Sequence, residues 1–323
     1  MDSPGRLRAI AVIFGCALVM SAFAQSYPAR PIKIVVQYSA GGVHDTLARI
    51  LQPRLAEGLG QPIVIENRPG AGGNIATEAV AKSAGDGYTV LMASDTVVVA
   101  SHLYRSTGFD VFKDFVPVTK LATFPMALVA HAEFPAANVG EFVARAREIP
   151  GKINVASPGA GTLNHLVAER FKAAAGIDLQ HVPYKGAAPA MTDLVAGRVQ
   201  CMFVTLAVAI PQARGGKLKI LGLTTAARSS LVPNVPTFAE SGYPGFEAGI
   251  YSGLLVPAGT SAEIVQRLNE EAARALRAPE VQARLAELGG VATPMTPSDY
   301  LAFLRQEHEH WGGIIRRSGI RVD

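Results

Sequence analysis

Two short glycine-rich segments combine the residue types that could bind a small anion. Residues 39–42, Ser-Ala-Gly-Gly, follow one apolar run, and residues 157–162, Ser-Pro-Gly-Ala-Gly-Thr, follow another. Each segment precedes a helical pattern, so its glycines expose backbone N–H groups at a helix N-terminus. Taken alone, each is explained equally well as a turn whose Ser, Thr or Asp caps a helix. Their corresponding positions favour a pair of junctions that together hold a small anion.

The sequence lacks the short motifs of common catalytic sites. It contains no G-x-S-x-G, no H-E-x-x-H and no G-x-x-x-x-G-K-[ST] segment. Residues 70–75 resemble a dinucleotide-binding loop, but Ile75 stands where the last small residue belongs, so turn glycines explain them better. The seven histidines show no metal-ligand spacing, and Cys16 and Cys201 are the only cysteines. We therefore expect no catalytic residue, no metal and no cofactor.

His44 and Asp45 add titratable groups to the first junction. Adjacent residues on a helix point apart, which argues against a catalytic pair. An anionic ligand beside His44 would favour the charged imidazole, so we expect binding to tighten as the pH falls from about 8 towards 6. The alternative is a solvated histidine on the outer face of the first helical turn.

Composition and the N-terminus indicate an exported globular protein. The chain has 323 residues, of which 49% are hydrophobic and 17% charged, and its formal net charge of +4 includes no basic run that would suggest nucleic acid. Arg6 and Arg8 precede an apolar run that ends in Ala22-Phe23-Ala24. This order is typical of a secretory signal peptide. We expect residues 1–24 to be cleaved and the mature chain to be periplasmic.

Strand-like and helix-like segments alternate along the mature chain, which predicts an α/β fold of mainly parallel sheets covered by helices. The first set has strands at 31–36, 62–66 and 88–94, with helices between them. The second set has strands at 126–130, 153–156, 179–182, 199–204 and 220–224 and helices at 139–148, 163–175 and 189–196. A strand at 253–256 then precedes two amphipathic helices, at 262–278 and 297–318.

Eight ordered segments resemble the Bug family, the substrate-binding proteins of tripartite tricarboxylate transporters. They include Gly41-Gly42-x-x-Asp45-x-x-Ala48-Arg49, Glu66-Asn67-Arg68-Pro69-Gly70, Asp86-Gly87-Tyr88-Thr89, Ser157-x-Gly159-x-Gly161-x-x-x-His165-Leu166 and His181-Val182-Pro183-Tyr184-Lys185-Gly186. The resemblance covers nearly the whole mature chain.

The resemblance implies a two-domain periplasmic binding protein of the type II-like class, which closes on a small organic carboxylate. It implies a discontinuous first domain, residues 27–125 and 250–323, and a second domain, residues 126–249. The residues and the resemblance together point to ligand contacts from both junctions, the end of the third strand and the end of the Cys201 strand. These are Ala40, Gly41, Gly42, His44, Asp45, Ser94, Ser157, Gly159, Gly161, Thr162 and Thr205.

The function implied is capture of the carboxylate by a monomer, which delivers it to membrane permease subunits of a tripartite tricarboxylate-type transporter. Two alternatives stay open. One is a ligand-binding sensor subunit that signals to a membrane protein, and the other is a secreted small-molecule enzyme that uses His44 and Asp45. The residues do not separate transport from sensing, because both need the same cleft.

Overall fold

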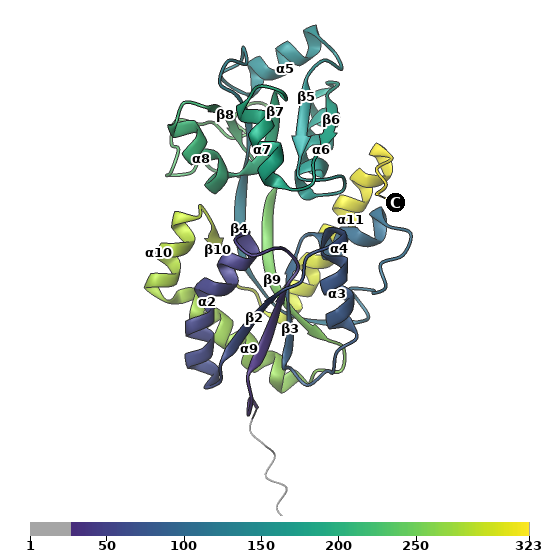
Figure 1. Ribbon diagram of the computed structural model, residues 1–323, viewed down its shortest axis with the longest axis vertical. Helices are drawn as coiled ribbons and strands as arrows, with labels where there is room; N and C mark the ends of the chain where they lie inside the picture. The colour runs from purple at the N-terminus through teal and green to yellow at the C-terminus, as the bar shows by residue number, and fades with distance from the viewer. Residues whose placement is uncertain (1–26, 323) are drawn as a thin grey trace, which may run out of the picture.

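The structure, a computed structural model, describes residues 27–322. They form two lobes joined by the long strands β4 (Phe115–His131) and β9 (Gly249–Pro257) (Figure 1). The expected signal peptide at residues 1–24 lies outside the described residues. Within residues 27–322 no helix is long and apolar enough to cross a membrane. The two-lobed α/β architecture that the sequence predicts is confirmed.

The first lobe contains a sheet in the order β2-β1-β3-β9-β4. Besides β9 and the first part of β4, its strands are β1 (Ile32–Val36), β2 (Ile63–Asn67), β3 (Thr89–Ser94) and the short β10 (Val291–Ala292). β1, β2 and β3 are parallel, whereas β9 is antiparallel to both β3 and β4.

Helices cover both faces of this sheet because alternate strand residues are apolar on opposite sides. Ile34 belongs to the core that includes residues of α2 and α9, and Val35 belongs to the core that includes α3, α4 and α11. The helices of this lobe are α2 (Val43–Leu59), the short η1 (Ala71–Gly73), α3 (Asn74–Ala81), α4 (Thr96–Leu103), α9 (Ala262–Arg277), α10 (Pro279–Glu287) and α11 (Pro297–Ser318).

In the second lobe β7 (Cys201–Thr205) lies between the second part of β4 and β5 (Asn154–Ser157). β6 (Gln180–Pro183) forms one edge, and β8 (Leu218–Leu223) pairs with β4. Residues of α5 (Val139–Glu148) and α6 (Leu163–Ala175) join the core on one face of this sheet. Residues of α7 (Ala187–Val195) and α8 (Leu206–Arg214) join the core on the other.

β4 changes partners between the lobes. Its residues up to Pro125 pair with β9, and its residues from Met126 pair with β7. We propose this change as the domain boundary at 125/126, with the return crossing at 249/250. The sequence analysis found only residues 126–130 of this strand. Pro117 and Lys120 interrupt the apolar pattern of the missed part, and the register with β9 shifts next to both residues.

The strand directions bring the carboxyl ends of both sheets to the boundary between the lobes. Because β9 is antiparallel to both β3 and β4, β4 leaves the first lobe in the direction in which β3 points. β7 is antiparallel to β4, and β5 is parallel to β7, so both run back towards the first lobe. The segments that follow β1, β3, β5 and β7 therefore meet at this boundary, where open α/β sheets bind ligands (Figure 1).

Candidate functional site

The first junction, residues 39–42, connects β1 to α2. Gly42 is the N-cap of α2, so no side chain caps this helix, and the first N–H with an acceptor in the helix is that of Thr46. The Gly41 N–H donates to Asp45 Oδ2 at 2.8 Å, and the Asp45 carboxylate also accepts from Arg49. Although burial opposes ionisation, hydrogen bonds from Arg49 and Gly41 lower the pKa of Asp45. Asp45 is thus an ionised group that holds the loop.

His44 is buried, with only 6% of its surface exposed. Its Nδ1 lies 2.6 Å from Ser252 Oγ on β9, and its ring stacks on Tyr38 with 5.0 Å between the ring centroids. Burial lowers the pKa of His44 to about 4. The alternative of a solvated ring is therefore wrong. In the unliganded protein the ring is therefore neutral between about pH 8 and 6, and the expected tightening of binding over this range stays a prediction.

A hydroxyl cluster lies at the end of β3. Ser94 Oγ is 2.7 Å from Thr96 Oγ1 and 3.1 Å from the Tyr38 hydroxyl. The Gln37 side chain fixes this end of the sheet, because it accepts from the Ser94 N–H and donates to Thr77 Oγ1. Ser94 is fully buried, so its hydroxyl contacts only the protein in this structure.

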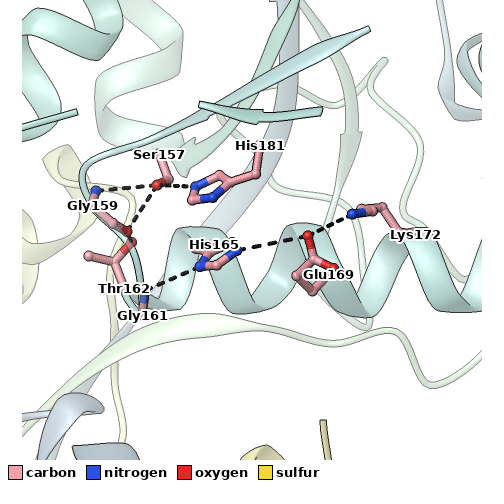
Figure 2. Close-up of polar contacts among 8 residues, drawn as sticks. All are labelled: Ser157, Gly159, Gly161, Thr162, His165, Glu169, Lys172 and His181. Carbon is pink, nitrogen blue, oxygen red and sulfur yellow. Dashed lines mark hydrogen bonds and ion pairs between the residues drawn. The ribbon is translucent and has the colours of Figure 1, made fainter. Parts of the chain in front are cut away.

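The second junction, residues 157–162, connects β5 to α6 (Figure 2). Ser157 is buried beneath it, where its Oγ donates to the Gly159 carbonyl at 2.9 Å and lies 2.7 Å from His181 Nε2. Thr162 is the N-cap of α6, yet its hydroxyl donates back to the Gly159 carbonyl at 2.8 Å and caps no N–H group. The first turn of α6 is therefore left without a side-chain cap, as in α2.

The two junctions share a hydrogen bond that holds the loop. In each, a glycine N–H donates to a side chain four residues later: Gly41 donates to Asp45, and Gly161 donates to His165.

The second junction also contacts the first lobe. A Cβ on Gly161 would lie 2.9 Å from Leu103 Cδ1 and 2.7 Å from Val322 Cγ2.

Three helix N-termini at the lobe boundary lack a side-chain cap. In α2, α6 and α8, which follow β1, β5 and β7, the N-cap side chain accepts no hydrogen bond from the first turn, although Thr162 and Thr205 stand at two of these positions. In α4, which follows β3, the Thr96 N–H donates to Ser94 Oγ at 3.3 Å. Of the helices that do not follow these strands, α5, α9 and α11 are capped by Asn138, Ser261 and Thr296, whereas α3, α7 and α10 have no side-chain cap. First-turn N–H groups without a side-chain acceptor, together with the helix dipoles, favour an anion at the boundary.

The eleven residues expected in the site divide into two groups. Exposed or half-buried are Ala40, Gly41, Gly42, Gly159 and Thr162. Buried are His44, Asp45, Ser94, Ser157, Gly161 and Thr205. All lie at the strand ends that meet at the boundary, and their contact with a ligand stays a prediction. Tyr38, Ser252 and His181 were not predicted in the site. Ser252 and His181 reach it only through contacts between segments far apart in sequence, whereas Tyr38 directly precedes the first junction.

Ser157 and His181 form a hydroxyl–imidazole pair of the kind that activates nucleophiles in hydrolases. Here the hydroxyl is fully buried and also donates to the Gly159 carbonyl, so the pair supports the loop. Cys201 is buried on β7, and burial raises the pKa of its thiol. Among residues 27–322 no group of three or more His, Cys, Asp or Glu side chains is placed to hold a metal ion.

Comparison with known proteins extends these observations. Residues 47–320 match the tripartite tricarboxylate transporter family receptor. Protein BugT of Bordetella pertussis is 35% identical over 323 residues, which cover 98% of each chain. A solved structure of an R. palustris protein with adipate has a TM-score of 0.84 and 34% identity, covering 92% of this chain and 100% of its own. MatC from Rhodopseudomonas palustris with bound malate has a TM-score of 0.80 and 34% identity, covering 90% and 100%.

The family model includes the second junction, the alignment with BugT spans both junctions, and together they confirm the resemblance to Bug proteins. The family is one of receptors rather than enzymes, and the periplasmic binding protein BugD is among the similar solved structures, so the enzyme alternative is excluded. With its two-lobed fold and its pair of uncapped junctions, this chain belongs to the family of tripartite tricarboxylate transporter receptors.

Proposed function

We propose that this chain captures a small organic carboxylate at the boundary between its lobes and delivers it to the permease subunits of a tripartite tricarboxylate-type transporter. The uncapped N-termini of α2, α6 and α8 are the observation that carries this proposal. A carboxylate oxygen accepts hydrogen bonds from such N–H groups and is stabilised by the helix dipoles. Malate and adipate bound to two relatives support the same ligand class.

The proposed ligand contacts come from the exposed part of each junction. Ala40, Gly41 and Gly42 are exposed in the first, and Gly159 and Thr162 are half-buried in the second. The buried residues, including Asp45 and Ser157, would act by holding these loops in place. This division explains how an anion can bind beside the ionised Asp45, because Arg49 and the Gly41 N–H already satisfy that carboxylate.

The setting of this function is the periplasm. We propose that residues 1–24 are a signal peptide removed after Ala24, and that the mature chain acts there as a monomer. Family membership supports a periplasmic receptor, and the transporter's permease is the partner that the family name implies.

The test is the affinity for malate and adipate of the wild type, Gly42→Val and Gly159→Val, measured by calorimetry. A Cβ on Gly42 has only Ser39 O near it, at 3.5 Å, and a Cβ on Gly159 has its nearest neighbours at 3.6 and 3.7 Å. Both variants should therefore fold but obstruct close approach to the backbone. We expect wild-type binding of at least one acid, and loss of that binding in both variants.

Gly215→Val is the matched control. Gly215 ends α8 at the helix end opposite the boundary, has a φ of −77°, and a Cβ there makes only ordinary contacts. It should bind as the wild type does. In a thermal-shift assay, ligand at 100 times its Kd stabilises the folded state by about 2.7 kcal/mol. Unchanged affinity in folded Gly42→Val and Gly159→Val proteins would move the site away from the junctions.

A further inference from the structure

We propose that His165 and His181 are positioning residues of the carboxylate site, which as neutral imidazoles fix the Gly161 N–H and the Ser157 hydroxyl and so set the shape of the second junction. The proposal rests on the proposed function, because it concerns the same site. His165 lies on α6 and is buried, and His181 lies on β6 and is half-buried (Figure 2).

The tautomer of His165 follows from its contacts. Its Nδ1 accepts a hydrogen bond from the Gly161 N–H at 3.1 Å, so Nδ1 carries no proton. The proton of the neutral ring is then on Nε2, which lies 3.8 Å from Glu169 Oε1 on the same helix. Protonation of Nδ1 would place one N–H against another and break the contact that holds Gly161.

The role of His181 follows from the single proton of the Ser157 hydroxyl. That proton is donated to the Gly159 carbonyl, so His181 Nε2–H donates to Ser157 Oγ, which also accepts from the Gly159 N–H at 3.2 Å. His181 therefore connects β6 to the end of β5. Because Thr162 also donates to the Gly159 carbonyl, these contacts together fix the turn from Ser157 to Thr162.

The stacking of the His165 and His181 rings is favourable only while both rings are neutral. They stack with 3.6 Å between centroids and 6° between planes, a geometry that two imidazolium ions would oppose. The charged groups that act on the two rings are Glu169 and Lys172 of α6, which pair with each other. Burial lowers the pKa of both histidines to about 4, so both are neutral near pH 7.

The first junction has a different acceptor, a carboxylate, at the corresponding position. There Asp45 occupies the place of His165, at the third residue of its helix, and accepts from the Gly41 N–H at 2.8 Å. An ionised carboxylate accepts throughout the range in which an imidazole begins to take up protons. Acid should therefore loosen the second junction before it loosens the first.

A first experiment needs no ligand. In the unliganded protein at pH 7, ¹⁵N NMR should show both rings as Nε2–H tautomers, and the Gly161 amide should be protected from hydrogen exchange. His165→Asn places an amide oxygen near the position of Nδ1 and should keep that protection, whereas His165→Leu should lose it. Equal protection of Gly161 in the Leu variant, or an Nδ1–H tautomer of His165, would overturn the assignment.

A second experiment measures the affinity for malate and adipate between about pH 7 and 4. At pH 7, His165→Leu and His181→Phe should bind about tenfold more weakly than the wild type, as expected for one lost hydrogen bond. His165→Asn and His181→Gln should bind within about threefold of it. The ratio of wild-type to His165→Asn affinity at each pH cancels the titration of the ligand, and it should fall as the pH approaches 4.

His131→Asn is the control, because His131 bonds the Leu194 carbonyl away from the junctions. It should follow the wild-type profile. Wild-type affinity in both His165→Leu and His181→Phe would overturn the positioning role while leaving the proposed function intact. Failure of the wild type to bind either acid would count against the proposed function instead, and the NMR experiment would still decide the role of the histidines.

Discussion

Three histidines at the lobe boundary, of which His44 and His165 are buried and His181 is half-buried, are neutral near pH 7. Burial lowers the pKa of His44, His165 and His181 to about 4. In each case a ring nitrogen contacts a residue from another strand or loop, namely Ser252, Gly161 and Ser157. An uncharged imidazole can both donate and accept, so it connects buried polar groups without the cost of burying an unpaired charge.

At the residue scale, His44→Asn should make the free energy of unfolding depend less on pH in the acidic range. The unfolded pKa of histidine is near 6.5 and the folded pKa is about 4, so the unfolded chain binds more protons between these values. The stability that the neutral ring contributes is fully present above about pH 6.5 and is lost as the pH falls towards 4, by up to about 3 kcal/mol. Asn provides a polar group near Nδ1 for Ser252 and does not titrate.

The measurement is the free energy of unfolding in guanidinium chloride, for both proteins, at intervals from about pH 7 to 4. The wild type should lose more stability than His44→Asn over this range. Parallel curves would show that His44 is not the buried neutral group that the structure indicates.

The two junctions have similar backbone geometry but differ in how tightly they are packed. Both place a left-handed glycine two residues before the helix, Gly41 with φ +84° and Gly161 with φ +76°. Around Gly41 a Cβ would meet nothing within 4 Å, whereas around Gly161 it would collide with Leu103 and Val322. The second junction is therefore packed against the first lobe, and the first junction is open.

At the element scale, Gly41→Ala and Gly161→Ala form a matched pair. Both should lose about 1 kcal/mol because alanine is strained at positive φ. Gly161→Ala should lose roughly a further 1–3 kcal/mol, because its methyl group must displace Leu103 and Val322. Urea unfolding of both variants measures the difference. Equal losses would mean that the contact between the second junction and the first lobe is absent in solution.

The two lobes are tied together where β4 and β9 cross. Thr224, which follows β8 and is 1% exposed, contacts both crossing segments. Its N–H donates to the Met126 carbonyl, its hydroxyl lies at hydrogen-bond distance from the Met126 and Ala248 carbonyls, and its own carbonyl accepts from the Ala248 N–H. α11 adds a second connection, because it packs against α4 of the first lobe and α6 of the second.

At the scale of the whole molecule, Thr224→Val should weaken the crossing. Valine keeps the shape of threonine but leaves the Ala248 carbonyl without the hydroxyl that now lies 2.6 Å away. We expect a loss of about 2 kcal/mol in the free energy of unfolding, since a buried acceptor is left unpaired. Thr224→Ser keeps the hydroxyl and loses only a methyl group, so it should cost about 1 kcal/mol. A larger loss in Ser than in Val would contradict the role of the hydroxyl.

The sequence by itself determined the family, the two glycine-rich junctions and the elements with regular apolar spacing. The predicted bounds of α5, α6 and α11 agree with the structure because local apolar periodicity sets them, with capping side chains at the starts of α5 and α11. The prediction missed helices whose local sequence signals point to different structures. The apolar run of α4 is as typical of a strand as of a helix, and Pro211 lies inside α8. Neither helix was predicted, nor was α10.

Only the tertiary structure decided which junction residues are buried and what holds them. Ser157 and His181 meet because β5 and β6 are adjacent, and His44 meets Ser252 because β9 returns from the second lobe to the first. The collision that a side chain on Gly161 would have with Val322 depends on the C-terminal segment reaching the lobe boundary. Burial and hydrogen-bond partners come from chain segments far apart in sequence, so spacing along the chain carries no record of them.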